Sequence, residues 1–171
     1  DAEGGAAYYE VNNGSWTKID VNDPKIAPQG YLIYTNHSYT GRLDDGMGYV
    51  RYTTAEKIMK EQIGRNGAIT PKWIFQNLSR TFYHSILGID LNKDKELVAK
   101  CNGWFMDQDF IPRKSTSCSI VIEGVKKGEN PANTVMWTIL GYAPIGVAVP
   151  LMVANGENIP SFMTAEGTEN A

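Results

Sequence analysis

Three polar residues that directly follow an apolar stretch are the part of this chain best suited to chemistry. Residues 30–35 are rich in β-branched and aromatic side chains, which predicts a buried strand, and Thr35-Asn36-His37 stand at its end. A buried strand is a rigid support, so polar side chains at its end can be held at the edge of a cleft. We therefore expect Thr35, Asn36 and His37 to form such an edge.

The other reactive side chains do not form a recognisable set. Cys101 and Cys118 are predicted to be small buried thiols, because free cysteine usually packs as a small apolar residue, and a disulfide between them is the alternative. The sequence has no Cys-x-x-Cys or His-x-x-x-His spacing, and its glycine-rich loop at 41–48 lacks a phosphate-binding pattern. His84 is expected to be a capping or surface residue at the end of a helix. We therefore expect neither a metal nor a cofactor.

Length and composition bound the class of protein. The chain has 171 residues and a net charge of -3, which fits one globular domain with a buried core. We expect this domain to span residues 1–156, followed by a loosely packed tail, residues 157–171. The mild acidity argues against a nucleic-acid partner, and no apolar run reaches the ~20 residues needed to span a membrane. Because the chain begins with Asp1 rather than Met, we expect it to be a piece of a longer protein.

The elements that must position the polar edge begin with three predicted strands. Residues 6–11 and 16–21 read as two strands, and Asn13-Gly14 between them predicts a hairpin turn because this pair accepts positive φ angles. Together with residues 30–35, these two strands are expected to form an antiparallel meander.

Two helices are predicted next. The first, residues 53–64, starts with a capping box whose N-cap is Thr53. The second starts at Thr70-Pro71, because Thr is a good N-cap and Pro suits the first helical position. Its apolar residues recur every four positions, at Ile74, Leu78 and Phe82.

Strands are predicted again in the last part of the chain, at residues 118–125, 134–140 and 146–153. Strands that are not separated by helices do not easily form a parallel array. The predicted fold class is therefore α+β, with antiparallel sheets and the helices packed on a sheet face.

Three stretches resemble one family. Residues 1–7 with Glu10, the Thr-Asn element after strand 30–35, and the late strands at 115–122 and 134–138 with the turn Gly141-Tyr142-Ala143-Pro144 occur in this order. Together they resemble the N-terminal-nucleophile (Ntn) hydrolases, in the branch of acyl-CoA:6-aminopenicillanate acyltransferase and choloylglycine hydrolase. The likeness covers the central and C-terminal part of such an enzyme.

The resemblance implies a four-layer αββα sandwich and hydrolysis or acyl transfer of a linear amide by an N-terminal cysteine. That nucleophile is not in this chain, so a missing N-terminal segment or subunit of the same protein is an expected partner. Asn36 would bind the oxyanion or the amine of the nucleophile. Further residues expected to line the cleft for the small-molecule amide are Thr35, His37, Arg42 and Arg113. The resemblance also favours an exported bacterial protein over a cytoplasmic one.

Two other hypotheses stay open. The chain could be a non-catalytic binding or structural α+β domain that keeps the same fold. It could also be a small α+β ligand-binding protein unrelated to the family. A cysteine upstream of Asp1 that self-cleavage exposes would favour the hydrolase.

Overall fold

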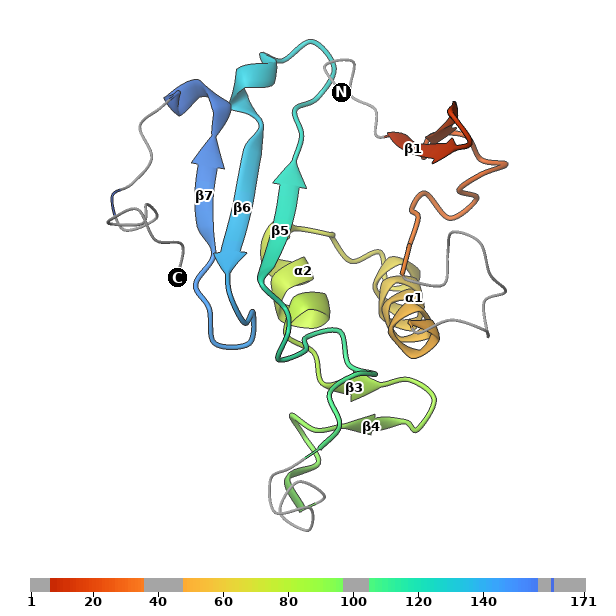
Figure 1. Cartoon of the computed structure of the whole chain (residues 1–171), viewed down its shortest axis with the longest axis vertical. Coiled ribbons are helices and arrows are strands. Elements are labelled where there is room, and N and C mark those ends of the chain that lie inside the picture. The colour runs from red at the N-terminus through yellow and green to blue at the C-terminus, as the bar shows by residue number, and fades with distance from the viewer. Residues whose placement is uncertain (1–6, 36–47, 97–104, 157–160, 162–171) are drawn as a thin grey trace.

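The structure is a computed structural model that describes residues 7–35, 48–96, 105–156 and 161. Within these residues it contains helices and three antiparallel sheets, which confirms the α+β class (Figure 1). The tail expected at 157–171 lies outside the described residues except for Ser161. In chain order the elements are β1 (Ala7–Asn12), β2 (Ser15–Asp20), α1 (Tyr49–Gly64), α2 (Pro71–Ile74), the π-helix η1 (Phe75–Ser79), β3 (Tyr83–His84), β4 (Ile89–Asp90), β5 (Cys118–Glu123), the 3₁₀-helix η2 (Pro131–Asn133), β6 (Val135–Leu140), β7 (Val149–Met152) and the 3₁₀-helix η3 (Val153–Asn155).

The first hairpin forms as predicted. Strands β1 and β2 pair antiparallel, and Asn12 lies opposite Ser15 across the turn. The turn residues Asn13 and Gly14 have φ angles of 49° and 78°, the left-handed conformation that Asn and Gly tolerate. The hairpin is a sheet of its own and lies apart from the three-stranded sheet (Figure 1).

The predicted meander is wrong because the third strand is absent. Residues 31–35 have no regular secondary structure, although Tyr31 is buried as expected. Tyr31 lies near α1, since the charges of Lys60 and Glu56 on that helix act on its hydroxyl. Tyr31 is therefore buried near a helix, and the run does not pair with the hairpin.

Helix α1 begins four residues before the predicted start. Its N-cap is Gly48, which makes no side-chain capping hydrogen bond, so the capping box predicted at Thr53 is wrong. The Thr53 hydroxyl instead donates to the Val50 carbonyl one turn earlier and contacts Ser85 on the following hairpin. A hydroxyl inside a helix can bond the preceding turn in this way, and here a tertiary contact competes with capping.

The start of the second helix is confirmed, but its course is not. Thr70 accepts a hydrogen bond from the Trp73 amide, and Pro71 is the first helical residue. After α2 the chain widens into the five-residue π-helix η1. A π-turn changes the angular spacing of side chains, so the four-residue repeat ends there. Phe75 is buried, whereas Phe82 lies beyond the helix and packs on Phe105 and Phe110.

The sheet β5–β6–β7 has one face covered by helix. Directly opposite residues share a face, and the register places Val121 opposite Trp137. On this inner face Ile139 is fully buried against Phe75 of η1, and Val121 and Trp137 pack on that core. The hydroxyl of Ser119 on β5 donates to Ser79 of η1 at 2.7 Å. The prediction of helices packed on a sheet face is therefore confirmed for the α2–η1 segment, whereas α1 packs against η1 and β3.

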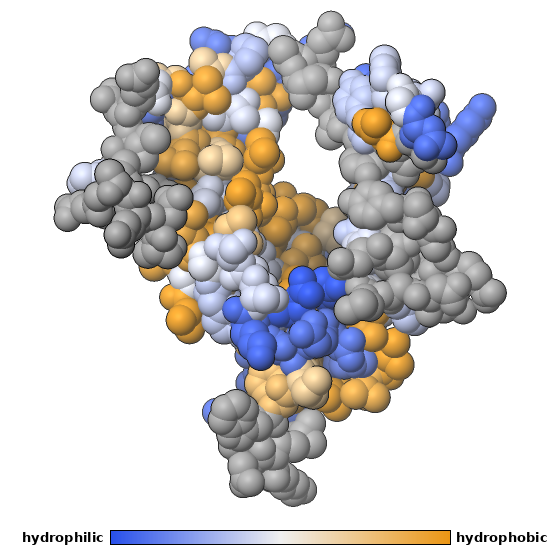
Figure 2. All heavy atoms as spheres, in the orientation of Figure 1, coloured by the Kyte–Doolittle hydropathy of each residue, from blue (hydrophilic) through white to orange (hydrophobic). Residues whose placement is uncertain are grey.

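The opposite face of this sheet is apolar and partly open. Ile120, Ile122 and Leu140 are 48 %, 66 % and 59 % exposed, and we call these three residues the open sheet face. Figure 2 shows hydrophobic residues gathered over the part of the molecule that carries the sheet. Cys118 also has an exposed thiol, so the prediction of a buried thiol is wrong at this position, whereas Cys101 lies outside the described residues.

No helix in the described ranges is long and apolar enough to cross a membrane.

Candidate functional site

The predicted polar edge is only partly within the described residues. Asn36, His37 and Arg42 lie outside them, and Thr35 is the last residue before that gap. Thr35 follows an irregular segment rather than the predicted strand. The rigid support expected for this edge is therefore not a strand but a segment that is anchored by the buried Tyr31.

Arg113 is the other predicted cleft residue, and it lies beside a second arginine. A tight turn fixes its backbone: the Arg113 amide donates to the Thr116 hydroxyl at 3.0 Å, and the Thr116 amide donates back to the Arg113 carbonyl at 2.8 Å. The Nε atom of Arg113 is buried and has no hydrogen-bond partner among the described residues. The guanidinium thus retains a donor for a group that the described residues do not supply.

The neighbour of Arg113 is Arg51, in the first turn of α1. Partial burial lowers the pKa of Arg51, the positive charge of Arg113 lowers it further, and Asp109 opposes the change. Two arginines and the carboxylate of Asp109 therefore act on one another in this region. Such a pair of guanidinium groups favours the binding of an anion, since arginine donates in a planar fork that matches carboxylates.

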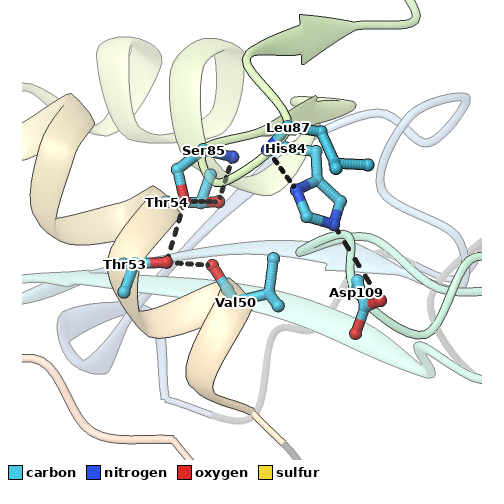
Figure 3. Close-up of polar contacts among 7 residues, drawn as sticks. All are labelled: Val50, Thr53, Thr54, His84, Ser85, Leu87 and Asp109. Atoms are coloured by element: carbon cyan, nitrogen blue, oxygen red, sulfur yellow. Dashed lines mark hydrogen bonds and ion pairs between the residues drawn. The ribbon is translucent and has the colours of Figure 1, made fainter. Parts of the chain in front are cut away.

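His84 is buried, with 8 % of its surface exposed, so the prediction of a surface residue is wrong, and it lies at the end of β3 rather than of a helix. Its ring packs edge-on against Phe110, with 5.9 Å between the ring centroids. Its Nδ1 atom accepts a hydrogen bond from the Leu87 amide at 3.3 Å, and its Nε2 atom lies 3.9 Å from Asp109 (Figure 3). The acceptor role of Nδ1 places the proton of the neutral ring on Nε2, toward the carboxylate.

The hydroxyl groups beside His84 form a closed set. The Ser85 amide donates to Thr54, the Thr54 hydroxyl donates to Ser85 Oγ, and Ser85 Oγ also contacts Thr53 (Figure 3). Because Thr53 donates to the Val50 carbonyl, the Ser85 proton is directed to Thr53. Among the residues that the structure describes, no base is therefore positioned to activate Ser85, and this set links α1 to the β3–β4 hairpin rather than forming a nucleophile and base pair.

A cleft of about 410 Å³ lies between the helical segment α2–η1 and the inner face of the sheet. Its apolar walls come from four residues, Pro71, Phe75, Trp137 and Ala148. Lys72, Arg80 and Glu123 add charge to its lining. A cleft of this volume with mainly apolar walls and a few polar groups is typical of small-molecule sites.

A second, polar cleft of about 550 Å³ lies among α1, η1 and the β3–β4 hairpin. Its lining includes Glu61, Asn77 and Asp90. The Asn77 amide already donates to the Trp73 carbonyl, and Asp90 pairs with Lys93 at 3.1 Å. These groups are partnered within the chain, so they point to no particular ligand. Among the described residues, no group of three or more His, Cys, Asp or Glu side chains could hold a metal ion.

Arg51, Arg80 and Asp109 carry no sequence motif that would mark them as site residues. They come from different elements and meet their neighbours only in the folded chain. One signal was present for Trp137, because the predicted hairpin of strands 118–125 and 134–140 brings Trp137 and Glu123 close together. The Trp137 indole indeed donates to Glu123 at 3.1 Å.

No family model, no curated protein and no solved structure matches this chain.

Proposed function

We propose that this chain is the central and C-terminal part of an amidase or acyltransferase of the Ntn-hydrolase kind. It would act on a linear amide together with an N-terminal cysteine that lies outside these residues. The proposal rests on the sequence likeness of the Thr-Asn element and the late strands.

The observation that carries this proposal is that, in the part of the chain that the structure describes, the sheet β5–β7 is covered by helix on one face only and exposes apolar side chains on the other. Helix covers its inner face, whereas the open sheet face exposes large apolar side chains. In a four-layer αββα sandwich each sheet has helices on one side and the other sheet on its second side. One helix layer and one sheet with an apolar free face correspond to half of that arrangement, and the missing N-terminal segment or subunit would supply the other half.

The arginine pair adds chemical support. An amide hydrolase must stabilise the oxyanion that develops on the carbonyl oxygen, and it often binds a charged group of its substrate. Arg113 offers a partly buried guanidinium whose Nε lacks a partner among the described residues, and Arg51 lies beside it. In the proposed enzyme these cations would hold a carboxylate of the substrate, while Asn36 would donate to the oxyanion.

The test uses the longer protein, extended upstream of Asp1 to the first cysteine that self-cleavage could expose. Intact mass should show the cleavage, and a panel of N-acyl p-nitroanilides should be hydrolysed until iodoacetamide blocks the thiol. Asn36→Ala should lower turnover by about 100-fold or more, the usual effect of removing an oxyanion donor. Asn22→Ala, in an exposed loop, is the matched control and should leave turnover unchanged.

Two outcomes would overturn this proposal. The first is a folded, extended protein that has no such cysteine or that hydrolyses none of the amides. The second is an Asn36→Ala variant with unchanged turnover, because the Thr-Asn element on which the likeness rests would then have no part in the reaction.

The second candidate is a non-catalytic binding domain with the same fold. The cleft beside Trp137 favours it, because this cleft lies between helix and sheet, on the face of the sheet opposite the open sheet face. A protein that binds a small molecule there and has no amidase activity in its extended form would support this candidate.

A further inference from the structure

The cleft beside Trp137 has apolar walls that belong to the core. Phe75 is only 4 % exposed and forms the core together with Ile139, while Trp137 and Ala148 pack against that cluster. These walls are held by packing on both the helical and the sheet side. A ligand would therefore meet a preformed apolar surface rather than one that must be ordered on binding.

The hydrogen bonds of the charged groups in the cleft are made to neutral partners. Glu123 accepts the indole hydrogen bond of Trp137, at 3.1 Å. Arg80 donates from Nε to the Ala143 carbonyl at 2.9 Å and from Nη2 to the Gly146 carbonyl at 2.7 Å. These two bonds fix the guanidinium in place, but both acceptors are neutral, so the positive charge of Arg80 is retained.

No carboxylate of the described residues lies within ion-pair distance of Arg80 or of the exposed Lys72. The lining of the cleft therefore carries two cations against one carboxylate, an excess of one positive charge, although the whole chain has a net charge of -3. An anion is attracted to such a place, and a cation is not.

We propose that this cleft binds a small monocarboxylate with an aromatic or aliphatic body. The body would lie against Phe75 and Trp137, and the carboxylate would lie on the side of Lys72 and Arg80. The volume of about 410 Å³ suits such a molecule. The inference rests on the cleft alone, so binding is expected whether or not the extended protein hydrolyses amides.

The experiment measures the indole N–H resonance of Trp137 by ¹H–¹⁵N NMR, assigned with Trp137→Phe. The probes are 4-phenylbutyrate and octanoate, each compared with its own neutral amide. Both carboxylates are expected to shift this resonance in a saturable way and to bind about fivefold more tightly than the amides, since the amides lack the charge that Lys72 and Arg80 attract.

Two variants locate the site. Ala148→Leu adds volume inside the cleft and should abolish the shift, while the rest of the spectrum reports that the fold is kept. Lys72→Gln should weaken the binding of both carboxylates about threefold and leave the binding of the amides unchanged. Lys25→Gln, in an exposed loop far along the chain, should change the binding of neither the carboxylates nor the amides.

The proposal is overturned if neither carboxylate moves the Trp137 resonance at saturating concentration. It is also overturned if Ala148→Leu, correctly folded, binds as the parent does. Equal binding of each carboxylate and its amide would remove the charge preference and with it the proposed class of ligand.

Discussion

Tyr31 is the residue at which burial has the clearest energetic consequence. Its side chain is buried, and its hydroxyl has no hydrogen-bond partner among the described residues. A buried polar group without a partner costs free energy of folding, because it has lost its bonds to water. The same burial raises the pKa of Tyr31; the charge of Lys60 opposes this rise, and that of Glu56 adds to it.

Tyr31→Phe should therefore stabilise the protein at pH 7, by about 1 kcal/mol, since it removes the hydroxyl and keeps the ring. A pKa that is higher in the folded state means that stability is present below the unfolded pKa near 10 and is lost as the pH rises from there through the folded pKa. The variant should accordingly lose less stability above pH 10 than the parent. Urea unfolding at pH 7 and at pH 10.5 measures both effects.

Tyr83→Phe is the matched control, because the Tyr83 hydroxyl is hydrogen-bonded to Lys57. This control should be neutral or slightly less stable at pH 7. If Tyr31→Phe is less stable than Tyr83→Phe, the claim that the Tyr31 hydroxyl is buried without a hydrogen-bond partner among the described residues is contradicted.

At the scale of elements, side-chain hydroxyl groups join helix α1 to the β3–β4 hairpin. Thr54 is fully buried and both accepts from the Ser85 amide, at 3.1 Å, and donates to the Ser85 hydroxyl, at 3.0 Å. Since Thr54 comes from the middle of α1, these bonds set how the β3–β4 hairpin lies on the helix (Figure 3).

Thr54→Val keeps the shape of the side chain but removes both bonds and leaves the Ser85 amide without its acceptor. We expect a loss of about 2 kcal/mol of unfolding free energy, measured by urea denaturation, and faster hydrogen exchange of the Ser85 amide. Thr53→Val, one residue away and partly exposed, should cost less than about 1 kcal/mol because water can replace its bonds. Equal losses in the two variants would argue against this role of Thr54.

At the scale of the whole molecule, the two faces of the sheet β5–β7 differ in how far their side chains are buried. Val121 packs on the core beneath the helices, whereas its neighbour Ile122 is 66 % exposed on the open sheet face. Adjacent strand residues point to opposite faces, so this pair compares the two faces at one place.

Ile122→Glu should change the unfolding free energy by less than about 0.5 kcal/mol and should reduce self-association of the isolated chain, measured by sedimentation velocity. Val121→Glu places a carboxylate at a partly buried position that packs on the core, and it should destabilise the chain by about 2 kcal/mol. If the isolated parent chain sediments as a monomer at every concentration, the open sheet face does not need a partner.

Rules that act between neighbouring residues made much of the fold predictable. Asn13-Gly14 encodes its turn because few other residues adopt positive φ there, and Thr70-Pro71 encodes a helix start through one hydroxyl and one fixed φ. The strands 118–125 and 134–140 were also predictable, since their β-branched composition and the turn between them are local features.

The failures occurred where distant parts of the chain meet. The apolar run at 31–35 was predicted as a strand from its composition, but contact with α1 satisfies the burial of Tyr31 without a strand partner. Thr53 was predicted as an N-cap, yet its hydroxyl is used by the Val50 carbonyl and by Ser85, 32 residues along the chain.

The sequence by itself determined the α+β class, the hairpins at Asn13-Gly14 and between strands 118–125 and 134–140, and the start of the second helix, because each depends on the φ preference, capping or alternation of a few adjacent residues. Only the tertiary structure decided that His84 is buried beside Asp109, that Arg51 lies beside Arg113, and that a cleft forms next to Trp137. Burial, the pKa of a group and the shape of a cleft depend on which distant side chains exclude water from it, and no local pattern specifies that.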